Sequence, residues 1–285
     1  MFNLESFIKI NKCLFPVAGY GTRFLPVTKA IPKEMLPILT KPLIQYGVEE
    51  AMSAGMTTMA MVTSKYKQAI KNHFEPHTDI ETSIKGTAKE ALLDEVNYAS
   101  EQCDFSYIEQ QEMLGLGHAI YTGKPLIGDE PFAVILPDDL CTSNGDSILK
   151  QMAALYVQHP DCCIVAIEEV PMTEVDKYGV IDGKLLKGST NAYQVSSMVE
   201  KPSPEEAPTN LAIIGRYILT PQIFNVLENT KQDKNGEIQI TDALMTLAKQ
   251  GKVIAYKFEG IRYDCGNVKG FVEATNAFAK SEGLI

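Results

Sequence analysis

The sequence has little that would place it in a membrane or carry it out of the cell. None of its 285 residues falls in an apolar run as long as a transmembrane helix, which needs about 18 residues or more. The N-terminal segment MFNLESFIKINK contains Glu5 and lacks the apolar core of a signal peptide. We therefore expect neither a leader nor a membrane partner, and we assign this segment no function.

Metal-binding and disulfide patterns are also missing. The four histidines are scattered, and no two cysteines form a C-x-x-C motif. Because Cys162 and Cys163 are neighbours inside an apolar run, buried free thiols in a reducing compartment are a better interpretation than disulfides or zinc ligands. The pattern predicts a cytoplasmic protein. The cysteines are Cys13, Cys103, Cys141, Cys162, Cys163 and Cys265.

Positive charge is scarce, since the formal net charge is −10. An acidic protein repels nucleic acid and anionic lipid, so we expect neither as a partner. Against this background Arg23, Lys29 and Lys33 form a local basic cluster. Such a cluster would draw an anionic substrate into one cleft.

These cations belong to the segment around which the chain is organised, residues 14–37. The apolar run at 14–17 predicts a buried strand, and the glycine turn Ala18-Gly19-Tyr20-Gly21-Thr22-Arg23 follows it. Such a turn lines up backbone N–H groups that hold phosphate, and Arg23 and Lys33 add charge for the phosphate oxygens. Phe24 stands where a dinucleotide fingerprint needs a small residue, and no Gly-Lys-Ser/Thr closes a P-loop. For the short glycine motif alone, an ordinary turn is the alternative.

The wider segment resembles a known family. Gly19-Tyr20-Gly21-Thr22-Arg23 followed by Pro32-Lys33-Glu34-Met35-Leu36-Pro37 is similar to the signature of sugar-nucleotide pyrophosphorylases. The similarity extends over nearly the whole chain, from Lys12 to the final helix. It implies a Rossmann-like nucleotidyltransferase fold that uses Mg²⁺ to join UTP and glucose 1-phosphate, giving UDP-glucose and pyrophosphate. It also implies a homo-oligomer, either a dimer or a tetramer.

Hydrophobic patterning predicts the α/β class with a doubly wound, mostly parallel but mixed sheet. We expect a single domain over 1–285, with a nucleotide-binding half at 12–170, a β-rich sugar-phosphate insertion at 171–220 and C-terminal helices at 221–285. In the helix predicted at 87–99, Ala88, Ala91, Leu92 and Val96 have the spacing of a buried face. The predicted strands are 14–17, 58–62, 105–109, 132–136, 162–168, 178–181, 193–201, 213–219 and 253–258. The other predicted helices are 43–54, 65–74, 147–158, 238–249, 268–280 and one that opens at Gly115.

Two aspartates follow the apolar strand predicted at 132–136. A carboxylate at the tip of a buried strand is held rigidly and suits Mg²⁺, although aspartate is also a common turn residue. The resemblance makes Asp138 the metal ligand and Asp264 its second aspartate. Because ligands of such sheets lie beyond the carboxyl ends of the strands, we expect Asp138, Gln110 and the glycine turn to meet in one cleft.

The resemblance also assigns the two substrates. Gln110 matches the uracil edge, which needs both a donor and an acceptor, and Gly115 and Gly117 let the backbone approach a flat base. Without the resemblance, Gln110 reads as a solvated loop residue. In the resembled family Glu200-Lys201-Pro202 binds the sugar phosphate, with Gly179 and Asn210 beside the sugar. Without it, the Glu200–Lys201 pair reads as an ordinary surface turn.

The predicted reaction needs no catalytic triad, and none is evident. Its obstacle is the approach of one anion to another, so catalysis consists of positioning and charge neutralisation. Arg23 and Lys33 would stabilise the departing pyrophosphate, Lys201 the attacking sugar phosphate, and Mg²⁺ on Asp138 the α-phosphate. The alternatives are a related enzyme that uses dTTP or another sugar, a glycosyltransferase, and a nucleotide-binding protein without turnover. Val268 stands where some relatives carry lysine, so no phosphate role is assigned to Lys269.

Overall fold

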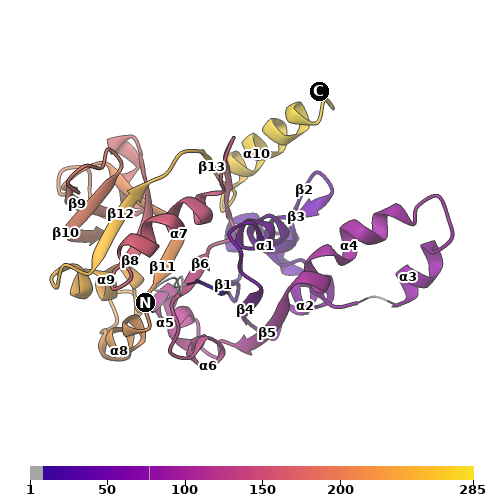
Figure 1. The fold of residues 1–285 in the computed structure, drawn as a ribbon, viewed down its shortest axis with the longest axis horizontal. Helices are drawn as coiled ribbons and strands as arrows, with labels where there is room; N and C mark the ends of the chain where they lie inside the picture. Colours follow the sequence, from indigo (N-terminus) through magenta and orange to yellow (C-terminus); the bar gives the residue numbers. More distant parts are fainter. Residues whose placement is uncertain (1–8, 77) are drawn as a thin grey trace, which may run out of the picture.

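The structure is a computed structural model that describes residues 9–76 and 78–285. Most of the N-terminal segment for which we expect no leader lies outside these residues. Within them, no helix is both long and apolar enough to cross a membrane. A nine-stranded sheet with the order β5-β4-β1-β6-β11-β8-β12-β10-β9 forms the centre of the molecule (Figure 1). The α/β class and the mixed sheet are as predicted.

One half of the sheet is parallel and lies close to the predicted segments. β1 pairs in parallel with β4 and with β6, and β4 pairs in parallel with β5. The interior residues of β1 and all of β6 are buried. These strands therefore end at one edge of the sheet, where the glycine turn follows β1. They are β1 Lys12–Pro16, β4 Thr58–Thr63, β5 Asp104–Glu109 and β6 Phe132–Ile135.

The other half is mostly antiparallel. β11 runs antiparallel between β6 and β8, β10 pairs antiparallel with β9 and β12, and β12 is parallel to β8. The segments that we expected to form an insertion over the cleft therefore extend the central sheet itself. These strands are β8 Cys163–Glu169, β9 Gly179–Leu185, β10 Ala192–Glu200, β11 Leu211–Leu219 and β12 Val253–Lys257.

Helices cover both faces of the sheet and give two main hydrophobic clusters. Residues of α5, α6, α8 and α9 pack on one face, and residues of α1, α2 and α7 pack on the other. All six cysteines are free, and four of them are buried as predicted, but Cys141 and Cys162 are only partly buried. The helices on the sheet are α1 Leu43–Ser53, α2 Gln68–Phe74, α5 Gly115–Thr122, α6 Lys124–Ile127, α7 Ile148–Gln158, α8 Gln222–Asn229 and α9 Ile240–Ala248.

Two short antiparallel strand pairs and four 3₁₀ turns of the described residues were not predicted. β7 pairs antiparallel with β13, and this register places Asp264 opposite Asp139. The final helix α10 packs Phe271 edge-on against Phe24 of the loop after β1, with the ring centroids 5.7 Å apart. The helix predicted at 268–280 is α10, Val268–Ser281. The elements that were not predicted are β2 Pro37–Ile38, β3 Lys41–Pro42, β7 Asp139–Thr142, β13 Ile261–Asp264, and turns η1 Thr22–Phe24, η2 Val27–Lys29, η3 Lys33–Met35 and η4 Met172–Lys177.

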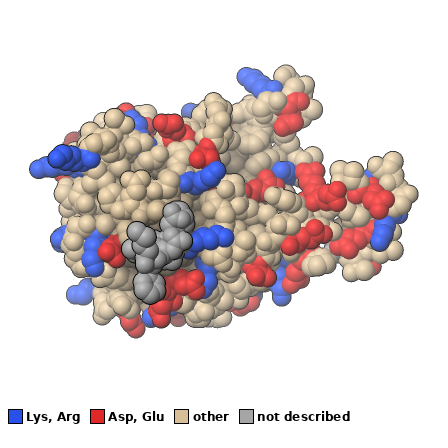
Figure 2. Space-filling model, in the orientation of Figure 1, with Lys and Arg blue, Asp and Glu red and all other residues tan. Residues whose placement is uncertain are grey.

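The helix predicted at 87–99 is wrong in its position and in its packing. Helix α4 spans Ala91–Gln102, and it projects from the body of the molecule together with α3, Thr78–Ile84 (Figure 1). Ala88 and Ala91 are exposed, and Leu92 is 51% exposed; the side chain of Val96 lies outside the description. Figure 2 shows acidic side chains over this projecting part. The amphipathic spacing predicted an apolar stripe along the helix, but such a stripe is buried only where another element packs against it.

Candidate active site

Eight of the predicted site residues line one cavity of about 960 Å³ at the carboxyl end of the sheet. Residues from both halves of the chain line it, so residues predicted for the nucleotide and residues predicted for the sugar phosphate face one cleft. Tyr178, Thr241 and Arg262, which were not singled out from the sequence, also line it. The predicted residues that line it are Arg23, Lys33, Gly115, Asp138, Gly179, Glu200, Lys201 and Asp264.

The loop after β1 folds back on itself and presents Lys33. Gly21 has the left-handed φ of +67°, and a Cβ there would lie 3.0 Å from the Lys33 Cβ. Thr28 Oγ1 donates a hydrogen bond to the Gly21 carbonyl oxygen at 2.8 Å. Below the loop, the buried carboxylate of Glu34 accepts a hydrogen bond from Lys67 Nζ at 2.7 Å. The glycine is therefore required by close packing within the loop, and the buried ion pair ties the loop to the residues after β4.

Lys33 and Asp138 form an ion pair at the wall of the cavity, with Nζ and Oδ2 2.6 Å apart. Burial pulls the pKa of Lys33 down, but the charges of Asp138 and Glu34 and the hydrogen bond to Asp138 together raise it. For Asp138, burial acts to raise the pKa, and the charge of Lys33 lowers it below its ordinary value. Both groups are therefore charged at neutral pH, and each supplies the other's counter-charge.

Asp138 and Asp264 point into the same small space beside Gly266. A Cβ on Gly266 would lie 2.9 Å from Asp138 Oδ2 and 3.0 Å from Asp264 Oδ1. Arg23 Nη1 donates to the Gly266 carbonyl oxygen at 3.5 Å. Among the described residues, no group of three or more histidine, cysteine or carboxylate side chains is placed to hold a metal. Two carboxylates fit Mg²⁺ because that ion usually completes its shell with substrate phosphates and water.

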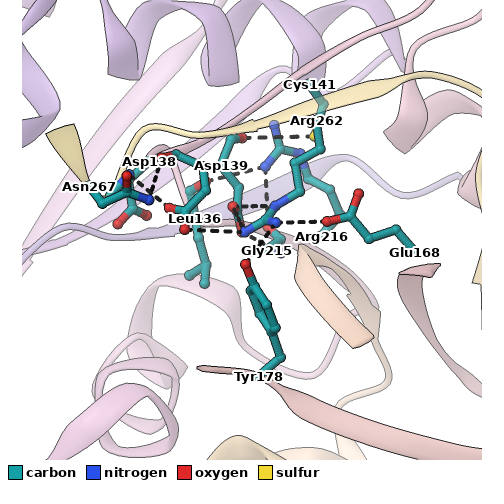
Figure 3. Close-up of polar contacts among 12 residues, drawn as sticks. Leu136, Asp138, Asp139, Cys141, Glu168, Tyr178, Gly215, Arg216, Arg262 and Asn267 are labelled. Atoms are coloured by element: carbon teal, nitrogen blue, oxygen red, sulfur yellow. Dashed lines mark hydrogen bonds and ion pairs between the residues drawn. The ribbon is translucent and has the colours of Figure 1, made fainter. Parts of the chain in front are cut away.

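Asp139 has a different environment from its neighbour. It is 8% exposed, its Oδ2 accepts the Gly215 N–H at 2.8 Å and its Oδ1 accepts Arg262 Nε at 2.6 Å (Figure 3). Burial raises the pKa of Asp139, against the opposing charge of Arg262. With both carboxylate oxygens engaged by the protein, Asp139 organises the site, and Asp138 is the aspartate left facing the cleft.

The residues predicted to bind the sugar phosphate lie at paired strand ends. Glu200 and Gly179 are register partners in β10 and β9, and Glu200 Oε2 accepts a hydrogen bond from Thr241 Oγ1 at 2.6 Å. A Cβ on Gly179 would lie 2.9 Å from that threonine oxygen, so a side chain here would displace Thr241 from its contact with Glu200. Lys201 follows with a left-handed φ of 47°, its Nζ 3.6 Å from Glu200 Oε1.

The glycines near Gln110 have a packing role that the sequence did not reveal. Gly115 has a φ of +90°, and a Cβ on Gly117 would lie 2.6 Å from the Ile238 carbonyl oxygen. That oxygen accepts the Gly117 N–H at 2.8 Å. Gln110 is 5% exposed and its Nε2 lies 2.8 Å from His118 Nδ1, so it is not a solvated loop residue. Contact of these three residues with a base stays a prediction.

The remaining predicted residues lie outside the lining of the cavity. Asn210 turns its side-chain amide to the Val170 carbonyl oxygen at 3.2 Å. Ala18 is buried, whereas a Cβ on Gly19 would meet open space. Gly21, Thr22, Gln110 and Gly117 are also not part of the wall of the cavity. All of these residues are close in sequence to residues that do line it. Their substrate contacts stay predictions.

Sequence reasoning missed Arg262, which contacts Asp139, Glu168 and Tyr178. A signal was present, because the alternation of a strand places Arg262 on the same face as Asp264 two residues later. No comparable signal marked Thr241, since its role depends on the approach of α9 to β10.

Comparison with known proteins identifies the family to which a chain with this arrangement is similar. The model of the nucleotidyl transferase family matches residues 16–281. The UTP–glucose-1-phosphate uridylyltransferase of Pseudomonas aeruginosa is 58% identical over 268 residues, which cover 94% of this chain and 95% of that protein. A crystal structure of apo UDP-glucose pyrophosphorylase superposes with a TM-score of 0.91 at 59% identity, covering 96% and 99% of the two chains. A UDP-glucose pyrophosphorylase complexed with UDP-glucose gives 0.87 at 57%, covering 95% and 99%.

Proposed function

The chain belongs to the nucleotidyl transferase family, and we propose that it joins UTP and glucose 1-phosphate to give UDP-glucose and pyrophosphate. Its high identity to a UTP–glucose-1-phosphate uridylyltransferase over nearly the full length supports this reaction. The observation that carries it is the composition of the cleft. One cavity holds a basic loop, two convergent aspartates and the Glu200–Lys201 pair, and these suit a triphosphate, a metal and a sugar phosphate.

The bond changes define what the residues must do. A phosphate oxygen of glucose 1-phosphate attacks the α-phosphorus of UTP, and the bond from that phosphorus to the bridging oxygen breaks as pyrophosphate leaves. The nucleophile is already ionised, so no general base is required. Arg23 and Lys33 line the side of the cleft formed by the glycine turn, where they would neutralise the departing pyrophosphate. The backbone of Ala18, Gly19, Gly21 and Thr22 would hold the phosphates.

Enzymes of this family generally use a divalent metal, and we propose Mg²⁺ on Asp138 and Asp264. When bound, the ion neutralises charge on the α-phosphate. Asp138 supplies a carboxylate whose pKa is lowered by Lys33, and it is therefore ionised at neutral pH. Because Lys33 Nζ pairs with Asp138, Lys33 is positioned to exchange that carboxylate for a phosphate oxygen.

The acceptor binds on the strand side in this proposal. Lys201 pairs with the phosphate of glucose 1-phosphate, and Glu200, oriented by Thr241, accepts hydrogen bonds from sugar hydroxyls. Gly179 keeps the wall of the cavity free of a side chain, and Asn210 is the more distant candidate contact. Gln110, Gly115 and Gly117 recognise uracil.

Three further predictions belong to this proposal. The whole chain acts as one nucleotidyltransferase domain, with 171–220 as the acceptor side, which the continuous sheet supports. The enzyme is cytoplasmic, and it assembles as a dimer or tetramer of identical subunits.

The test is a pyrophosphate-release assay with purified protein, Mg²⁺, UTP and glucose 1-phosphate. We expect turnover that requires both substrates, with dTTP and other sugar 1-phosphates as comparison substrates. Nucleotide binding without pyrophosphate release would contradict the proposal and favour a binding protein. Release with dTTP in preference to UTP would identify the related enzyme instead.

A further inference from the structure

One buried arginine has partners on both sides of the cleft. The side chain of Arg262 is 7% exposed. Its Nε donates to Asp139 Oδ1 at 2.6 Å, and its Nη1 donates to Glu168 Oε1 at 2.7 Å and to the Tyr178 hydroxyl at 3.3 Å (Figure 3). Its Nη2 also lies 4.0 Å from Asp264 Oδ2. Arg262 thus contacts Asp139, the neighbour of Asp138, and Tyr178, the residue directly before strand β9 on the proposed acceptor side.

Tyr178 extends this contact to the residues proposed to hold the sugar phosphate. Its ring lies under the guanidinium, with the Arg262 Cζ 5.1 Å from the ring centroid. Its carbonyl oxygen accepts the Lys201 N–H at 2.9 Å, and Gly179 follows it directly in the chain. Lys201 has a left-handed backbone conformation that residues other than glycine rarely adopt. Such a conformation persists only where neighbouring contacts hold it. Tyr178 provides one of those contacts.

The other buried arginine of this region has a different set of partners. Arg216 is 1% exposed, and its Nη2 lies 2.7 Å from Glu50 Oε2 in helix α1. Its Nη1 donates to the carbonyl oxygens of Leu136 and Gly215. These contacts join the sheet to a covering helix and do not reach the acceptor residues. Of the two arginines, Arg262 is the one whose contacts continue into the cleft on both sides.

Arginine has properties that this position requires. Its planar fork can bond several acceptors at fixed angles, whereas lysine carries a single point charge. Burial pulls the pKa of Arg262 down, but the charge of Asp139 and the bonds to Tyr178 and Glu168 raise it overall. The side chain therefore stays charged, and it balances carboxylates that would otherwise repel one another.

We propose that Arg262 is a positioning residue that holds the acceptor-phosphate site at a fixed place relative to the metal carboxylates, acting through Tyr178. This inference rests on the proposed function, because it assigns the two sides of the cleft to the two substrates. Arg262 itself does not contact the reacting atoms. Its effect is on the alignment of the attacking phosphate, and displacements of about 1 Å from ideal alignment cost on the order of a hundredfold in rate.

The test compares the binding of UMP with that of UDP-glucose by calorimetry, which needs no turnover. Because the second phosphate of UDP-glucose is the one supplied by glucose 1-phosphate, the gain in affinity from UMP to UDP-glucose reports on the acceptor side alone. Arg262→Lys keeps the charge and loses the fork, and we expect it to reduce this gain about tenfold, as for the loss of a charge-assisted hydrogen bond. UMP affinity should change by less than about twofold, since the charge balance near Asp138 is kept. In the assay, the KM for glucose 1-phosphate should rise more than the KM for UTP.

Tyr178→Phe tests the same path with a smaller change and keeps the proposal falsifiable if Arg262→Lys does not fold. It removes the hydroxyl that accepts the Arg262 bond, so we expect a reduction of about threefold, typical of a neutral partner. The matched control is Tyr256→Phe, because that hydroxyl donates a bond of similar length, 3.4 Å, to Gln151 Oε1 outside the cavity. It should leave the gain unchanged.

The double variant Arg262→Lys with Tyr178→Phe decides whether the two residues act in one path. Coupled residues give non-additive effects, so the double variant should lose little more than Arg262→Lys alone. Additive losses, equal weakening of UMP and UDP-glucose, or an unchanged gain in Tyr178→Phe would each overturn the proposal. If the unaltered protein binds neither nucleotide, the proposed function has failed and this inference fails with it.

Discussion

The proposed nucleotide side and the proposed acceptor side of the cleft are built in different ways. On the nucleotide side, Arg23 and Lys33 lie on a loop of 3₁₀ turns that side-chain contacts hold in place, including the buried Glu34–Lys67 pair. On the acceptor side, Glu200 ends strand β10 and is a register partner of Gly179 in β9. Backbone hydrogen bonds place the acceptor residues, whereas ion pairs place the basic loop. We therefore expect charge-removing changes to disturb the nucleotide side more.

The largest expected effect is that of Asp138→Asn, which would break the nucleotide side. The change keeps the shape but removes the charge that pairs with Lys33 and would hold Mg²⁺. We expect kcat to fall on the order of a hundredfold or more, because metal stabilisation of the transition state is worth several kcal/mol. The control is Asp146→Asn, which alters an exposed pair with Lys150. Full activity of Asp138→Asn at ordinary Mg²⁺ would remove Asp138 from the site.

Arg23→Ala should affect the rate more than nucleotide binding. Its charge matters most as pyrophosphate departs, so we expect kcat to fall about ten- to a hundredfold, equivalent to about 1.5–3 kcal/mol for a charged hydrogen bond. UTP affinity, measured by calorimetry, should fall less. A rise in the KM for UTP with unchanged kcat would make Arg23 a ground-state binding residue.

Lys201→Met tests the other side of the comparison. Methionine keeps most of the packing of the lysine stem, so only the charge near the acceptor is removed. We expect kcat/KM for glucose 1-phosphate to fall about tenfold or somewhat more, with UTP affinity unchanged. Lys184→Met, on an exposed position of the same β9–β10 pair, is the matched control. Equal damage to both substrates would show that the two sides are not separate.

The smallest effect concerns stability and pH. The lowered pKa of Asp138 means that its contribution is present above the ordinary value of 3.8 and is lost as the pH falls through the lowered one. The raised pKa of Lys33 means that its contribution is present below 10.5 and is lost as the pH rises through the raised value. Lys33→Met should therefore cost about 1 kcal/mol of unfolding free energy, by a constant amount from pH 5 to 9 and by less under about pH 3. Urea unfolding at several pH values measures this, and a difference that varied between pH 6 and 8 would contradict it.

Much of the fold followed from local pattern. The apolar runs of β1, β4 and β6 predicted buried strands because their periodicity and length are strand-like whatever their neighbours. The antiparallel half was harder to place, since alternation reports that a face is buried but not which strand lies beside it. The apolar face assigned to the helix near Leu92 failed for a related reason, because burial depends on what covers a helix.

The candidate site likewise has features that local sequence predicted and features that only the tertiary structure determined. Local features of the sequence, a glycine turn and a strand-end carboxylate, identified Arg23, Lys33 and Asp138, whereas Lys201 was singled out only through the family resemblance. Only the tertiary structure decided which charges meet. Lys33 and Asp138 are separated by 105 residues, and Arg262 and Asp139 by 123, so their pairing depends on the order of the strands and on the β7–β13 register. That is also why neighbouring Asp138 and Asp139, alike in sequence, differ in the fold: the alternation of the chain turns one toward the cleft and the other toward a buried arginine.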